Sequence, residues 1–141
     1  MCVRPDSGAG SGICDRGPGP VHVDHATWVH NVGLKPLGIS IFQRREGDRF
    51  ATFGSWRGYP PENPSHDGGP TMAAAWARRV PAQGATLPVT SDPEQHYFNI
   101  LVSFTGVHGS AGPVHLSYTD ADGHHGTVDT LVTVRILPTC P

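Results

Sequence analysis

The chain has 141 residues, including 18 glycines and 14 prolines, with 16% charged residues and a formal net charge of −2. This length fits one domain with a buried core. The near-neutral charge argues against a nucleic-acid-binding protein, which usually carries a basic excess. No apolar run is long enough, at about 18 residues, to indicate a transmembrane segment.

Residues 1–20 hold many of the glycines and prolines and contain no regular alternation of apolar and polar residues. This composition is typical of a flexible segment with little capacity to pack. We therefore predict a flexible leader over residues 1–20, followed by a single domain over residues 21–141.

The first half of the domain shows short apolar–polar alternations, the pattern of strands with one buried face. A break is expected at residues 35–38, Lys-Pro-Leu-Gly. The predicted strands cover residues 21–24 and 27–32, as one long or two short strands, and residues 38–44 and 49–53, as a hairpin.

Residues 71–79 leave two alternatives open. Three alanines in this stretch favour a helix, but prolines stand at positions 70 and 81. We expect either a strand or a short helical turn that connects the two halves of the domain.

The C-terminal third alternates more clearly and predicts three successive antiparallel strands at residues 97–104, 114–119 and 128–136. Residues 120–123, Asp-Ala-Asp-Gly, carry turn chemistry. In the last strand one face is expected to hold Val128, Thr130, Val132, Val134 and Ile136. Seven or eight short strands in total indicate an all-β fold, an antiparallel β-sandwich.

Residues 80–90 (VPAQGATLPVT), 118–123 (YTDADG) and 133–136 (TVRI) resemble immunoglobulin-like β-sandwich modules of secreted bacterial proteins. The resemblance covers roughly residues 80–137. It implies an immunoglobulin-like chain path and an extracytoplasmic location, and it implies no activity.

Three cysteines, Cys2, Cys14 and Cys140, lie near the ends of the chain. A Cys14–Cys140 disulfide would join the two ends of the domain and remove about 4–5 kcal/mol of unfolded-chain entropy; Cys2–Cys14 is the competing pair. Either bond indicates an oxidising compartment, hence a secreted or cell-surface protein. Cys2, followed by a Gly/Ser-rich stretch, is similar to the mature end of a bacterial lipoprotein, which implies a lipid anchor there.

The segment at residues 54–70 is long, rich in proline and predicted to lack regular structure, and such loops are often functional. It carries Trp56, Arg57, Tyr59 and His66, of which the aromatic and arginine types are enriched at binding hot spots. These side chains are expected to contact a protein or carbohydrate partner. The alternative is that they fold back over an open sheet edge.

Nine histidines accompany a single lysine. One cluster holds His22, Asp24 and His25, and a second, in the predicted hairpin turn, holds His124 and His125. Imidazole and carboxylate groups ligate zinc or copper if the fold brings them together; otherwise they are solvated surface groups. On a regular strand His22 and Asp24 share a face, and His25 points away unless the chain bends.

No sequence pattern typical of an activated nucleophile or a phosphate-binding loop is present, so we do not favour an enzyme. The sequence predicts a non-catalytic extracytoplasmic binding or structural module with a contact loop at residues 54–70. The alternative is a secreted copper- or zinc-binding domain that uses the clustered histidines.

Overall fold

The computed structural model describes residues 2–3, 7–13, 17–43, 45, 56–57, 73–89, 98–130 and 133–137. Within these ranges the chain forms mainly short strands, and residues 73–77 form a helical turn. The strands are β1 (Cys2–Val3), β2 (Ser7–Ile13), β3 (Val21–Trp28), β4 (Asn31–Val32), β5 (Lys35–Gln43), β6 (Trp56–Arg57), β7 (Val80–Pro81), β8 (Thr86–Leu87), β9 (Phe98–Thr105), β10 (Gly109–Ala111), β11 (Val114–Thr119), β12 (His125–Asp129) and β13 (Val134–Ile136).

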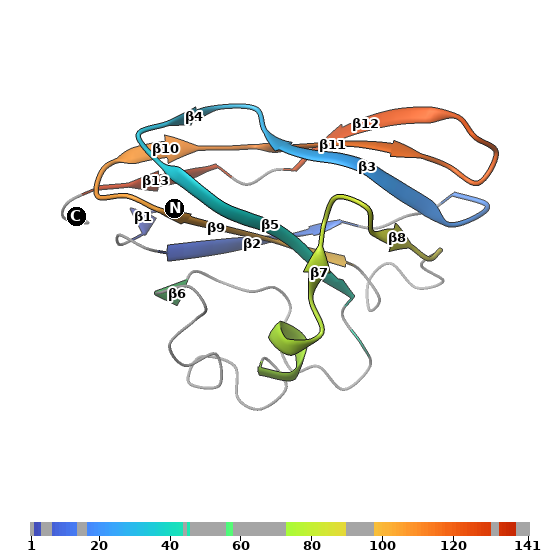
Figure 1. Ribbon diagram of the computed structural model, residues 1–141, viewed down its shortest axis with the longest axis horizontal. Coiled ribbons are helices and arrows are strands. Elements are labelled where there is room, and N and C mark those ends of the chain that lie inside the picture. Colours follow the sequence, from blue (N-terminus) through green and yellow to red (C-terminus); the bar gives the residue numbers. More distant parts are fainter. Residues whose placement is uncertain are drawn as a thin grey trace.

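The described strands form three sheets, with strand orders β1-β13-β10-β4, β12-β11-β3-β8 and β6-β2-β9-β5-β7. The pairings are antiparallel, except for the parallel pairing of β1 with β13. Figure 1 shows that β3, β11 and β12 continue into β4, β10 and β13, so the two four-stranded sheets lie together on one side of the five-stranded sheet. The predicted all-β sandwich is confirmed.

The main core lies between these layers. Ile100, Val102 and Phe104 on β9 face it from the five-stranded sheet, and the Phe104 ring meets the Trp28 ring edge-on at 6.3 Å between centroids. The opposite layer contributes Val23, Leu87, Ala111, Val114, Leu116, Val134 and Ile136. Because burial of apolar surface is the main favourable term in folding, this cluster is what holds the layers together.

A second, smaller cluster covers the other face of the five-stranded sheet. Leu101 points there, opposite to its neighbours on β9, and packs with Phe42, Ala75 and Trp76. Ala75 and Trp76 belong to the helical turn. Of the two alternatives left open for residues 71–79, strand or helical turn, the described residues 73–77 form the helical turn. In the described part of the chain, no helix is long and apolar enough to cross a membrane.

The predicted leader over residues 1–20 includes a strand at Ser7–Ile13. This stretch forms β2, which pairs with β9 from Gly8 opposite Ser103 to Ile13 opposite Phe98. Strand pairing uses main-chain N–H and C=O groups, which glycine and serine carry like any other residue. A composition without an apolar pattern therefore does not exclude a strand.

Two further predictions in the strands need correction. No break occurs at residues 35–38, because β5 runs through them and absorbs Leu37 as a register shift between Pro36 and Gly38. The predicted strand at 128–136 is divided between β12 and β13, which belong to different sheets.

This division changes the burial of the predicted inward face. Val128 lies on the edge strand β12 and is 44% exposed, whereas Thr130, Val134 and Ile136 are buried as predicted. Val132 and residues 49–53 lie outside the described residues.

Candidate functional site

The outer face of the sheet formed by β12, β11 and β3 is polar and rich in histidine. Apolar side chains such as Val23 and Leu116 point to the core, so the intervening residues point outward. The strand register aligns these outward residues in three rows: His22, Thr119 and His125; His25, Ser117 and Thr127; and Thr27, His115 and Asp129.

A register shift in β3 places Asp24 and His25 on this same outer face. Ser117 pairs with His25 and the next residue, Tyr118, pairs with Val23, so Asp24 has no partner on β11. This is the count of a β-bulge, in which two residues of one strand stand against one of the other. Because the chain bends at this bulge, His25 shares the outer face with Asp24.

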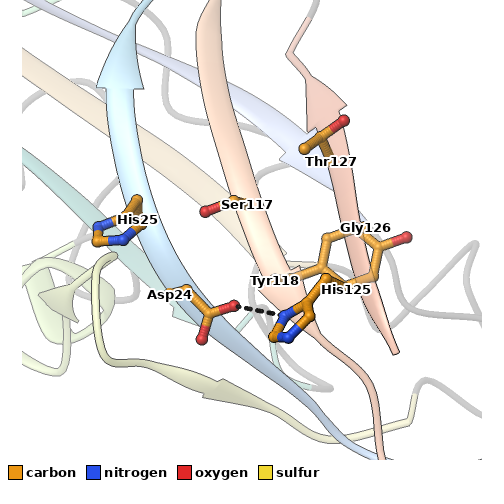
Figure 2. A pocket seen from close by; sticks show the side chains of 7 residues that line it. All are labelled: Asp24, His25, Ser117, Tyr118, His125, Gly126 and Thr127. Carbon is orange, nitrogen blue, oxygen red and sulfur yellow. Dashed lines mark ion pairs between the residues drawn. The ribbon is translucent and has the colours of Figure 1, made fainter. Parts of the chain in front are cut away.

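Asp24 reaches across β11 toward β12 (Figure 2). The Thr119 hydroxyl donates a hydrogen bond to Asp24 Oδ2 at 2.8 Å and lies 2.9 Å from His125 Nδ1. The distance from Asp24 Oδ2 to His125 Nδ1 is 3.9 Å. The two sequence clusters, around positions 24 and 125, therefore meet at Thr119.

Asp24 and His125 border an open surface depression of about 600 Å³ between β3 and β12. In the described part of the chain, the buried hydroxyl oxygen of Ser117 in its wall has no hydrogen-bond partner. The lining residues are Asp24, His25, Ser117, Tyr118, His125, Gly126 and Thr127. Polar atoms from β3, β11 and β12 thus line one depression.

The hairpin turn after β11 holds a separate group. Ligand-type atoms of Asp120, Asp122 and His124 lie within 4.8 Å of one another. Asp120 Oδ1 accepts hydrogen bonds from the backbone N–H groups of Asp122 and His124, both at 2.9 Å. The bond from the His124 N–H is the main reason why the pKa of Asp120 lies below its ordinary value. Turn closure accounts for these contacts, with Gly123 at a φ of 83°.

Four histidines of this sheet and its hairpin turn direct Nδ1 toward a protein oxygen. His22 faces Thr86 Oγ1 at 3.4 Å, His124 faces Asp120 Oδ2 at 3.3 Å, and His125 faces Thr119. His115 Nδ1 contacts Asp129 Oδ1. Ligating histidines typically bond one ring nitrogen to an oxygen and offer the other to the metal.

The structure thus brings together only part of the predicted metal-binding set. Asp24 and His125 are in contact through Thr119, and His25 borders the same depression. His22 lies in the row of His125 but leans toward β8, and His124 belongs to the turn. Thr119 was not predicted from the sequence, because a threonine within a strand pattern does not indicate which polar groups it contacts.

The other predicted site residues are described only in part. Trp56 and Arg57 form β6, an edge strand whose backbone pairs with β2. Cys2 lies in β1, next to β13. Tyr59, His66, Cys14 and Cys140 lie outside the described residues. The contact loop, the disulfide and the lipid anchor stay predictions.

Comparison of the chain with protein-family models, with curated proteins and with solved structures gives no match. The immunoglobulin-like resemblance therefore also stays a prediction. Because an all-β sandwich hosts many functions, the function must be inferred from the chemistry of the site.

Proposed function

We propose that this protein binds a divalent transition-metal ion, zinc or copper(II), in the depression between β3 and β12. The ligands are the imidazoles of His25 and His125 and the carboxylate of Asp24. One observation carries the proposal: a carboxylate and an imidazole from sequence clusters about 100 residues apart approach to 3.9 Å at a depression that His25 also lines.

The donor set selects the class of metal. Imidazole and carboxylate together suit zinc and copper, whereas magnesium and calcium favour sites made of oxygen donors. Three protein ligands leave a coordination position for water or another small ligand. With the His125 side chain 82% exposed, the ion would be accessible and exchangeable rather than a buried structural element.

One side-chain movement completes the set. In Figure 2 the His25 ring lies on the side of β3 away from His125. His25 is exposed, so its ring can turn between staggered rotamers without displacing core side chains. Binding would therefore order His25 toward Asp24 and His125.

The remaining predictions belong to the same proposal of an extracytoplasmic domain. The cysteines near both ends of the chain support an oxidising compartment. A partner-binding role for Trp56, Arg57, Tyr59 and His66 rests on their residue types alone, so the metal site is the function that the geometry favours.

Isothermal titration of the metal-free protein with zinc and with copper(II) tests the proposal. We expect saturable binding with a Kd of about 10 μM or tighter, equivalent to roughly −7 kcal/mol. His25→Ala and His125→Ala should each weaken it at least about tenfold. His30→Ala and His108→Ala serve as matched controls, because both histidines are exposed and lie outside the depression. Equal losses in the controls, or no saturable binding by the wild type, would contradict the proposal.

A further inference from the structure

β12 is the longest open strand edge in the described part of the chain. It is the outermost strand of its sheet and has five residues, whereas the other edge strands, β1, β4, β6, β7 and β8, have two residues each. No described segment pairs with its outer side. Its sequence, His-Gly-Thr-Val-Asp, contains no lysine or proline, and its pairing with β11 contains no bulge. These are the devices that usually keep strand edges apart.

We infer that two copies of this protein associate by antiparallel pairing of β12 with β12, about a twofold axis at Thr127. The inference is independent of the proposed metal site. Pairing would join the two four-stranded sheets edge to edge. A twofold dimer requires a surface that complements itself, so that each copy offers what the other needs. The backbone, the outer face and the inner face of β12 each meet this requirement.

The backbone groups of β12 divide between β11 and the open edge. The Thr130 N–H donates to the Val114 C=O, and the Asp120 N–H donates to the His124 C=O, both at 2.9 Å. In an antiparallel pair, hydrogen-bonded residues alternate with residues whose backbone groups point away from the partner strand. The even-numbered residues of β12 therefore bond to β11. The N–H and C=O groups that point to the open edge belong to His125, Thr127 and Asp129.

This division restricts the register of a β12–β12 pair. Backbone groups that point to the edge can bond only to groups of the second copy that also point to its edge. With Thr127 opposite Thr127, every such residue has a partner, and each pair exchanges two N–H···O bonds. A register centred on any other residue leaves at least one residue of each strand without a partner. The pairing at Thr127 is therefore the one that satisfies most backbone groups.

The same register places opposite charges together on the outer face. His125 lies opposite Asp129 of the second copy, and the twofold axis repeats the contact. The two side chains are 82% and 53% exposed, so their pairing disturbs no core contact. The contact with His115 uses Oδ1 of Asp129, so Oδ2 can face the second copy. Opposite charges directly across a strand pair stabilise a sheet.

On the other face the register covers an exposed apolar side chain. Val128 is 44% exposed. It would lie opposite Gly126 of the second copy, over which the Tyr118 ring lies, because a Cβ at Gly126 would collide with that ring. Since Gly126 has no side chain to intervene, Val128 can pack on the ring. Contacts between aromatic and β-branched side chains across strands are favourable.

Sedimentation velocity of the metal-free protein, with its cysteines kept reduced, tests for the dimer. Because one strand edge gives a small interface, we expect a reversible dimer with a Kd of about 10–100 μM. Thr127→Pro removes an N–H that β11 does not use, and it should raise the Kd at least about tenfold. Thr127→Val keeps the N–H and a β-branched side chain, so this matched control should dimerise like the wild type. A wild type that is monomeric at about 500 μM, or a folded Thr127→Pro that dimerises equally well, overturns the inference.

An exchange of charges tests the register without proline. His125→Asp places a carboxylate opposite Asp129 of the second copy and should weaken the dimer about tenfold near pH 6, where imidazoles carry appreciable positive charge. Adding Asp129→His to this variant restores an opposite pair and should recover most of the affinity. Circular dichroism establishes that both variants are folded. A folded double variant as weak as the single variant would contradict the register.

Hydrogen exchange at low and high protein concentration locates the interface. The amides of His125, Thr127 and Asp129 should become protected only at high concentration, whereas those of Gly126 and Val128 should be protected at both, because they bond to β11. Protection that instead rises along β4, β7 or β8 would place the contact at another edge and overturn the inference. Since no metal is present in these experiments, their failure leaves the proposed metal binding intact, and the absence of metal binding leaves the dimer intact.

Discussion

Asp24 Oδ2 on β3 and His125 Nδ1 on β12 lie 3.9 Å apart although β11 separates their strands. Two features allow this approach: Asp24 lies on the outer face together with His22, and the small Thr119 side chain stands between Asp24 and His125. A larger outward residue at position 119 would keep the two groups apart. The contact links sequence clusters that carry no common motif.

The charge of Asp24 is expected to matter for metal binding more than for stability. Asp24→Asn should lower zinc and copper affinity about tenfold, because a neutral amide is a poorer ligand than a carboxylate. The free energy of unfolding should change by less than about 1 kcal/mol, since an ion pair whose histidine is largely exposed contributes little. Titration calorimetry and urea denaturation measure the two effects. Asp129→Asn, which alters the pair with His115 outside the depression, is the control.

Asp120 is expected to make the hairpin sensitive to acid. Its pKa in the native protein lies below the ordinary value of 3.8, chiefly because its carboxylate accepts the His124 N–H. A lowered native pKa means that the unfolded state binds the proton more readily, so this stabilisation is present above about pH 4 and is lost as the pH falls through the native pKa. Urea midpoints between about pH 5 and pH 2 should fall less in Asp120→Asn than in the wild type. Parallel curves for both proteins would contradict this role.

The position of the Tyr118 ring is expected to require a glycine at position 126. A Cβ at this position would lie 2.4 Å from Cζ of Tyr118, so the ring must move in Gly126→Ala. We expect a loss of about 1 kcal/mol in the free energy of unfolding, at the low end for overpacking because the ring is half-buried. In a Tyr118→Ala background the same substitution should cost nothing, and a double-mutant cycle measures the difference.

Two valines of the predicted strand at 128–136 should respond differently to truncation. Val134→Ala should cost about 2 kcal/mol or more, because it removes two buried methyl groups from the main core. Val128→Ala should stay within about 0.5 kcal/mol, because Val128 is exposed on β12. Urea unfolding of both variants checks this pair. If both variants lost similar amounts of unfolding free energy, residues 128–136 would form one strand with a continuous buried face, which would contradict this prediction.

Removal of residues 1–13 tests whether β2 is part of the domain. A chain that begins at residue 14 loses the strand between β6 and β9, which leaves one edge of β9 unpaired. We expect a lower unfolding midpoint and a greater tendency to aggregate, because unpaired strand edges associate readily. A midpoint equal to that of the full chain would instead support a flexible leader.

Much of the fold could be predicted from local patterns. Alternation along residues 98–104 and 114–119 is a property of consecutive residues, and it fixed both the strands and their buried faces. The turn at 120–123 was equally local, since Asp120 and Gly123 supply the cap and the positive φ that a tight turn needs.

The candidate site depended on partners far away in the chain. Sequence identified the His–Asp clusters, but the face of His25 was decided by a register shift against Ser117 and Tyr118 on β11. A shift of one residue moves a side chain to the other face of a sheet, and the shift in β3 appears only in its pairing with β11.

Sequence by itself therefore determined that this protein is a β-sandwich with two polar clusters, because periodicity and turn chemistry act between near neighbours. Tertiary structure alone decided that β2 is a strand, that Val128 is exposed, and that Asp24, Thr119 and His125 meet. Each of these depends on main-chain hydrogen bonds between distant segments, and such bonds leave no pattern in the residues that form them.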